Sequence, residues 1–262
     1  MASEFLESVR KLLNETRQDR VCRAFMARKG GKTGIVPFLG ATAPVYLFLG
    51  LNPAGIDIAE PPTGAEDFID WATGYFSSPD TDRGSFASYL PLTSNQSGDY
   101  AAFGQVSMVT HLVPLQTQRS SEITLPLVKN CWPRVQRLLA AARPKLILCH
   151  GSLVWKFLTG LEEGTTTQLP DLPDELRHSV ADLYERVEAE RLPFQSRIVG
   201  LSEEVRPWFL PLVHLGGAGG GKDVRKKTEL AAVRARRAMH AGPAEAVTTS
   251  VGPTRIRVRK PG

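Results

Sequence analysis

The chain has 262 residues, 42% hydrophobic and 23% charged, which is the usual composition of a globular protein. Its net charge is +5, and no apolar run approaches the ~20 residues that span a bilayer, so the composition argues against an integral membrane protein. Residues 1–7 lack the basic stretch and apolar core of a secretory signal. We therefore expect a cytoplasmic protein.

Three cysteines, Cys22, Cys131 and Cys149, lie far apart in the sequence, and no Cys-x-x-Cys pair occurs. This spacing suggests neither a zinc site nor a disulfide framework. We expect three buried thiols that pack as small apolar side chains, and no metal or other cofactor.

The N-terminal half of the chain is expected to begin with a helix over residues 3–17, which Ser3 can cap. Residues 28–44 are rich in glycine and proline and are expected to form a loop. An apolar run predicts the first strand at 45–51. Residues 53–105, rich in Pro, Gly, Ser and Asp, predict a long irregular loop of the kind that is usually functional.

The second half alternates apolar runs with helical patterns. A helix from about Ser121 should be divided by Pro126 and Pro133, and Ser152 should cap the helix that follows the third strand. The other expected elements are strands at 106–113, 145–150, 198–199 and 208–215, and helices at 174–191 and 222–240.

This alternation predicts a single three-layer α/β/α domain over residues 1–240, with a four-stranded, mainly parallel central sheet. Residues 241–262 are expected to be a basic, disordered tail. We expect a monomer.

Polar residues stand at the carboxyl ends of three predicted strands, where ligands bind in open α/β sheets. They are Asn52, His111 and His214. An amide is not basic near neutrality, but it can accept a hydrogen bond from a water molecule and orient it. A histidine can donate to an oxygen on which charge develops.

Three segments carry a resemblance to a known family. They are Leu49–Ile56, with its Gly-x-Asn-Pro loop, Val109–Pro114, and Arg143–Gly151. In this order the sequence resembles the uracil-DNA glycosylase superfamily over about residues 44–56, 106–158 and 208–240. The resemblance implies a monofunctional glycosylase that hydrolyses the N-glycosidic bond of a flipped pyrimidine in DNA and leaves an abasic site.

The resemblance also implies roles for individual residues. Asn52 would position the attacking water, and His214 would stabilise the departing base. His111 would contact the edge of the base, which Gly50 and Leu51 would also border. An aromatic residue that follows the first motif, Phe68 or Trp71, would stack on the base, and His150 is expected to be structural.

Two departures from the family pattern bear on the substrate. His111 stands where the family has a base-reading asparagine, so uracil or a modified pyrimidine is expected. Residues 214–221 are glycine-rich and contain no bulky side chain that could enter the base stack. We therefore expect action on single-stranded DNA or on a duplex with a weakened pair.

Basic residues gather near the C-terminal end, and Lys222, Arg225 and Lys226 are expected to bind DNA phosphates. Residues 216–222 also fit the Gly-x-x-x-x-Gly-Lys pattern of a phosphate-binding loop. However, Asp223 stands where a nucleotide triphosphatase needs Ser or Thr for magnesium, and no later strand can supply a second metal ligand.

Three functions remain open on the sequence. The first is a glycosylase acting in base-excision DNA repair. The second keeps the chemistry but acts on a bulky modified cytosine in phage DNA, which would be a defence role. The third is a nucleic-acid-binding module on the same fold without catalytic activity.

Overall fold

The computed structural model of the chain describes residues 2–28, 34–53, 61–78, 99–117, 119–185, 192–202, 205–212, 230 and 233–236. A six-stranded mixed sheet forms its centre, in the order β1-β3-β2-β4-β6-β5. The strands are β1 (Phe38–Gly40), β2 (Tyr46–Gly50), β3 (Ser107–His111), β4 (Leu146–His150), β5 (Phe194–Gln195) and β6 (Trp208–Leu212).

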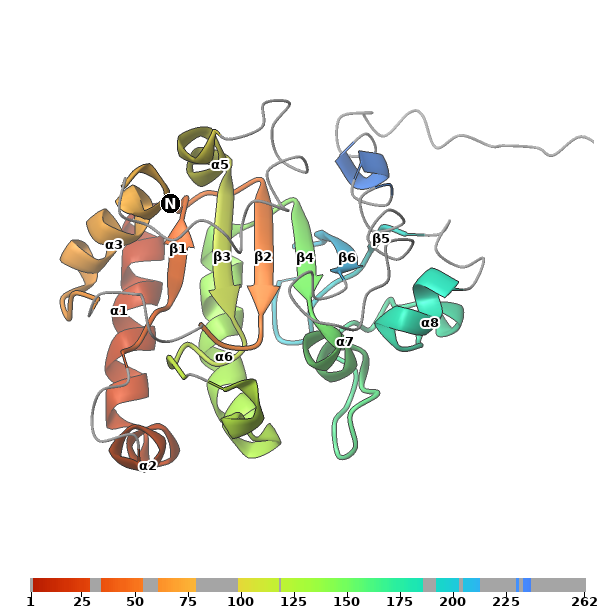
Figure 1. Cartoon of the computed structure of the whole chain (residues 1–262), viewed down its shortest axis with the longest axis horizontal. Coiled ribbons are helices and arrows are strands. Elements are labelled where there is room, and N and C mark those ends of the chain that lie inside the picture. The colour runs from red at the N-terminus through yellow and green to blue at the C-terminus, as the bar shows by residue number, and fades with distance from the viewer. Residues whose placement is uncertain are drawn as a thin grey trace, which may run out of the picture.

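The protein is therefore α/β, as the sequence predicts, but the expectation of four strands is wrong. The inner strands β3, β2, β4 and β6 pair in parallel, whereas β1 and β5 pair antiparallel at the two edges. All residues of β2 and β3 are buried. In Figure 1 the arrows of β2, β3 and β4 point the same way, so their carboxyl ends lie along one edge of the sheet.

Helices surround the sheet. They are α1 (Ala2–Gln18), α2 (Arg20–Arg28), α3 (Ala65–Gly74), α5 (Tyr100–Val106), α6 (Leu125–Ala142), α7 (Ser152–Thr159) and α8 (Val180–Glu185). Short 3₁₀ helices η1 (Tyr75–Ser77), η3 (Ser120–Glu122) and η4 (Asp174–Leu176) complete the described elements. The predicted first helix is confirmed by α1, and a helix after the third strand is confirmed by α7.

Several expected boundaries are wrong. Residues 53–105 are not irregular throughout, because they contain α3, η1 and most of α5. Helix α6 is continuous rather than divided: Pro126 stands in its first turn, where no N–H is needed, and Pro133 is accommodated inside it. The strand expected at 198–199 lies instead at β5, and the region expected as a loop at 28–44 contains β1.

A chain of aromatic rings joins the two faces of the sheet around its β1 edge. Successive centroids lie 4.9–5.8 Å apart along Phe38, Phe68, Trp71, Tyr75, Phe76, Phe103 and Phe48. Phe38 lies opposite Thr110 in the register, and Phe48 lies opposite Val109, so the two ends of the chain belong to opposite faces. This packing fixes α3 and α5 against the sheet.

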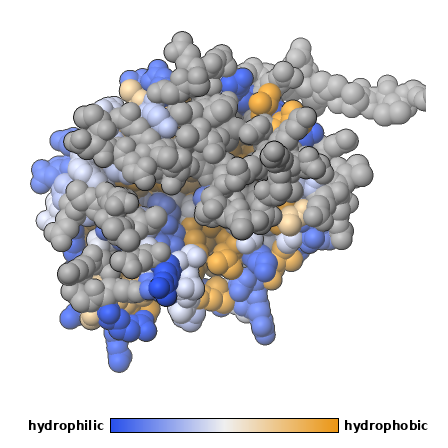
Figure 2. Space-filling model, viewed as in Figure 1, coloured by the Kyte–Doolittle hydropathy of each residue, from blue (hydrophilic) through white to orange (hydrophobic). Residues whose placement is uncertain are grey.

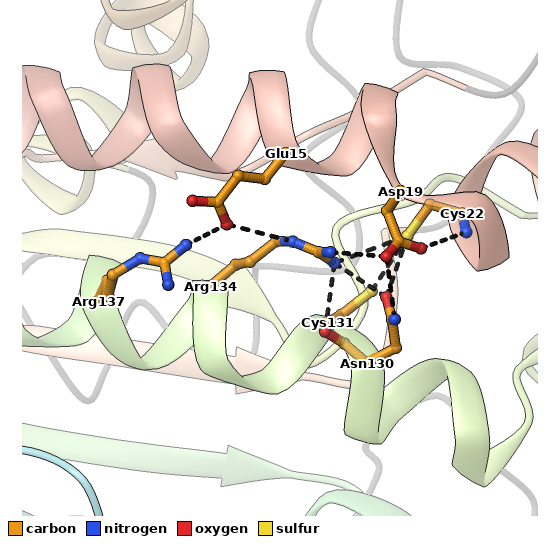
Figure 3. Close-up of polar contacts among 7 residues, drawn as sticks. All are labelled: Glu15, Asp19, Cys22, Asn130, Cys131, Arg134 and Arg137. Carbon is orange, nitrogen blue, oxygen red and sulfur yellow. Dashed lines mark hydrogen bonds and ion pairs between the residues drawn. The ribbon is translucent and has the colours of Figure 1, made fainter.

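A partly buried polar cluster joins α1, α2 and α6 (Figure 3). The Arg134 guanidinium of α6 donates to the Asp19 carboxylate at 2.9 Å, and Asp19 also accepts the Cys22 backbone N–H of α2 at 2.9 Å. Burial alone would raise the pKa of Asp19, but the hydrogen bonds from Cys22, Asn130 and Arg134 lower it to about 2. Asp19 therefore caps α2 and pairs with α6 at the same time.

Candidate functional site

The carboxyl ends of the three neighbouring strands β3, β2 and β4 carry His111, Gly50 and His150 in a row. Gly50 lies beside His111 in the register. Leu49 lies beside Cys149, so the next residues, Gly50 and His150, follow side by side. Residues in register on parallel strands project to the same face of a sheet. Two imidazoles therefore flank a position that has no side chain.

Gly50 is required by the close approach of the His111 ring. A Cβ atom at this position would lie 2.8 Å from Cδ2 and 3.3 Å from Nε2 of His111. Real Cβ atoms essentially never approach a heavy atom to 2.8 Å. The Cδ2–Nε2 edge of the imidazole thus lies over the Gly50 backbone, in the space that a side chain would fill.

The His111 imidazole is neutral. Its side chain is buried, with 9% of the residue exposed, and its Nδ1 has no hydrogen-bond partner among the residues that the structure describes. Burial, and secondly the charge of His150, lower the pKa of His111 to about 3. At neutral pH the ring therefore has one N–H donor and one lone-pair acceptor.

The loop after β2 is tied to the loop after β3 by backbone hydrogen bonds. Leu112 N donates to Gly50 O and Val113 N donates to Leu51 O, both at 2.9 Å. The second loop is itself held to residues before β1, because Gln116 Oε1 accepts the Gly34 N–H at 3.0 Å. The segment that carries the Gly-x-Asn-Pro motif therefore has a fixed position beside the end of β3.

Asn52 is oriented by this arrangement. Its Nδ2 donates to Pro53 O at 3.0 Å and to Thr117 O at 3.5 Å. Both amide hydrogens thus have carbonyl partners, whereas Oδ1 accepts no hydrogen bond from any described residue. The side chain is partly exposed. The amide can therefore present its oxygen as an acceptor in a defined direction.

The two aromatic residues expected to stack on a base lie on α3. Phe68 is fully buried, with 0% exposed, and its ring lies 5.6 Å from Phe38 and 5.4 Å from Trp71. Since Phe38 lies beside Thr110, Phe68 packs on the face opposite to the one that His111 faces. Phe68 is therefore a core residue, and the stacking of Phe68 or Trp71 on a base stays a prediction. Trp71 is partly buried and packs between Phe68 and Tyr75.

The predicted residues His214, Lys222, Arg225 and Lys226 lie outside the described residues. The structure brings together Gly50, Asn52 and His111, with Leu51 in the same loop. It also adds His150, which the sequence suggested only as a structural residue. His150 could have been suspected from the sequence because it ends its predicted strand, as His111 nearly does. The sequence does not show, however, that the two strands lie on either side of Gly50.

The surface beside this row is partly apolar. Figure 2 shows orange surface in the lower centre, where Figure 1 places α7 at the foot of β4. Leu153, in the first turn of α7, is 44% exposed. The helix begins directly after His150 and Gly151, so its first turn lies next to the row of imidazoles.

The cysteines form no disulfide and no metal site among the described residues. All three cysteines are free and buried, as expected, and burial raises the pKa of Cys149 in β4 far above its usual range. Among the described residues, no group of three or more His, Cys, Asp or Glu side chains could hold a metal ion. No described helix is long and apolar enough to cross a membrane.

Neither the protein-family models nor the curated proteins with which we compared the sequence gave a match.

Proposed function

We propose that this protein is a DNA glycosylase, similar to the uracil-DNA glycosylase superfamily, that releases a flipped pyrimidine by hydrolysis. The observation that carries the proposal is the orientation of Asn52 at the carboxyl end of β2. Two carbonyls hold its Nδ2, so its Oδ1 can accept a hydrogen bond from a water molecule. The neighbouring His111 offers a neutral imidazole at the end of the adjacent strand.

The proposed reaction needs few groups. As the N-glycosidic bond breaks, positive charge develops on the sugar and negative charge on the departing base. A water held by Asn52 adds to the sugar carbon and loses its proton to solvent, because an amide is too weak a base to take it. In the proposal His111 contacts the edge of the base, and His214 stabilises the charge that leaves with it.

DNA is the proposed partner, and Lys222, Arg225 and Lys226 are the proposed phosphate contacts. Each phosphate contact on single-stranded DNA contributes about −0.7 to the slope of log K against log salt concentration. Replacing all three residues with alanine should therefore make the slope less steep by about 2. An unchanged slope would remove these residues from the proposed interface.

The test of the activity is alkali cleavage of end-labelled oligonucleotides that carry one uracil, single-stranded or opposite guanine or adenine. We expect strand breaks at the uracil with the wild type. Asn52→Ala should lower the rate by about 10²-fold or more, the scale of losing one oriented polar group in an active site. His178→Asn is the matched control, because this histidine lies between η4 and α8 and not at the end of a strand.

The outcomes separate the candidate functions. Release of uracil that depends on Asn52 supports the glycosylase. Release only from DNA that carries modified cytosine would show that the glycosylase acts on the modified cytosine of phage DNA and not on uracil. Salt-sensitive binding without any base release, unchanged in Asn52→Ala, would identify a binding module and overturn the proposal.

A further inference from the structure

The two polar side chains of the site differ in how firmly their hydrogen-bonding pattern is fixed. The Asn52 amide donates to two backbone carbonyls, so its nitrogen and oxygen have defined positions. His111 has no such partner: its Nδ1 is buried and makes no hydrogen bond to any residue in the described part of the chain. The proton position in a histidine is normally set by the hydrogen bond that one ring nitrogen makes.

The consequence is that both neutral tautomers of His111 are open to it. With the proton on Nε2, the ring edge over Gly50 is a donor. With the proton on Nδ1, the same Nε2 is a lone-pair acceptor. The burial that lowers the His111 pKa to about 3 keeps the ring neutral, so changing tautomer does not require a buried charge.

A pyrimidine presents one of two groups at its C4 position. A 4-oxo pyrimidine, such as uracil, presents an acceptor and needs a donor from the protein. A 4-amino pyrimidine, such as cytosine, presents a donor and needs an acceptor. A side chain with a fixed pattern satisfies one group and leaves the other unpaired, which lowers affinity for the wrong base.

We propose that His111 makes the base-binding step tolerant of both 4-oxo and 4-amino pyrimidines, because its unpartnered Nδ1 leaves Nε2 free to act as donor or acceptor. The inference rests on the proposed function, since it assumes that His111 faces the flipped base. It concerns recognition alone. The chemical step still favours the 4-oxo base, which carries negative charge more readily as it leaves.

The test measures binding without cleavage. Fluorescence anisotropy is recorded with single-stranded oligonucleotides that carry one 2′-fluoroarabinosyl uracil, cytosine or adenine, since the 2′-fluorine suppresses breakage of the N-glycosidic bond. We expect the uracil and cytosine strands to bind within about threefold of each other, and each about tenfold more tightly than the adenine strand. A difference of tenfold or more between uracil and cytosine would overturn the inference.

Two variants sharpen the result. His111→Leu removes both ring nitrogens and should weaken the uracil and cytosine strands by the same factor, whereas His178→Leu should change neither. Weakening of only one strand by His111→Leu would show a fixed tautomer and overturn the inference.

The alkali assay on ordinary uracil DNA, run in parallel, separates the inference from the function on which it rests. Base release together with unequal binding overturns the inference alone. Equal preference for both pyrimidines, with no base release from uracil DNA or from modified-cytosine DNA, overturns the glycosylase and supports tolerant base recognition. If the protein shows no base release and no base preference, both the inference and the glycosylase are overturned.

Discussion

Acidification should destabilise the fold through His111. In the folded protein its pKa is about 3, whereas the ordinary value of 6.5 applies to the unfolded chain. The unfolded state therefore binds a proton below pH 6.5 that the folded state does not bind. Stability is fully present above pH 6.5 and falls as the pH drops from 6.5 toward 3.

The expected magnitude follows from this window. At pH 5 the unfolded chain lies 1.5 units below its pKa, so at 1.36 kcal/mol per unit the free energy of unfolding should fall by about 2 kcal/mol relative to pH 7.5. His111→Asn removes the titrating group and keeps a polar side chain. The variant should lose about 2 kcal/mol less than the wild type between these two pH values, whatever its stability at pH 7.5.

Urea unfolding followed by tryptophan fluorescence measures this difference at both pH values, with His178→Asn as the control for removing a histidine. If wild type and His111→Asn lose the same free energy between pH 7.5 and pH 5, His111 is not buried as a neutral ring. The proposed role of its two tautomers would then have no physical basis.

Two further substitutions test the site and the core. Gly50→Ala places a methyl group 2.8 Å from the His111 ring, so the free energy of unfolding should fall by about 1–3 kcal/mol and the rate of base release by about tenfold or more. At Gly74 a Cβ meets no atom within 4 Å, so Gly74→Ala should be neutral or stabilising by up to about 1 kcal/mol. Arg134→Met leaves the partly buried Asp19 carboxylate without its cation and should cost about 2–3 kcal/mol. Arg137→Met removes only a half-exposed ion pair with a glutamate and should cost at most about 1 kcal/mol. Thermal unfolding measures the stability of all four variants, and the alkali assay measures base release by the two glycine variants. Equal losses of stability within either pair would contradict the contacts described for Gly50 or for Arg134.

Sequence patterns predicted the inner strands well because each is a continuous apolar run. Strands β2, β3, β4 and β6 are five residues each and almost entirely buried, which is the pattern of parallel strands covered on both faces. The edge strands β1 and β5 have three and two residues and exist only through pairing with a neighbour. Such short segments carry no periodicity of their own, so no local pattern could predict them.

Because local patterns do not show which strands are neighbours, the sequence predicted some site residues and not others. Asn52 and His111 stand out because each interrupts or follows an apolar run at a place where ligands bind in α/β sheets. The pairing of His111 with Gly50, and the place of His150 on the other side of that glycine, depend on the strand order. The packing of Phe68 against Phe38 in the core could not be predicted, because position after a motif does not show which face of the sheet a helix covers.

A His111 that is neutral near pH 7 also limits which residue can stabilise the charge of the departing base in the proposed reaction. An imidazolium would oppose the negative charge of a departing base most strongly, but protonating His111 at pH 7 would require overcoming a pKa that burial lowers to about 3. The residue can therefore offer the base a hydrogen bond and no charge. In the proposed reaction the positive charge therefore has to come from another group, and His214 is the residue proposed for it. The proposed reaction thus assigns recognition of the base to a neutral residue and stabilisation of its charge to a separate one.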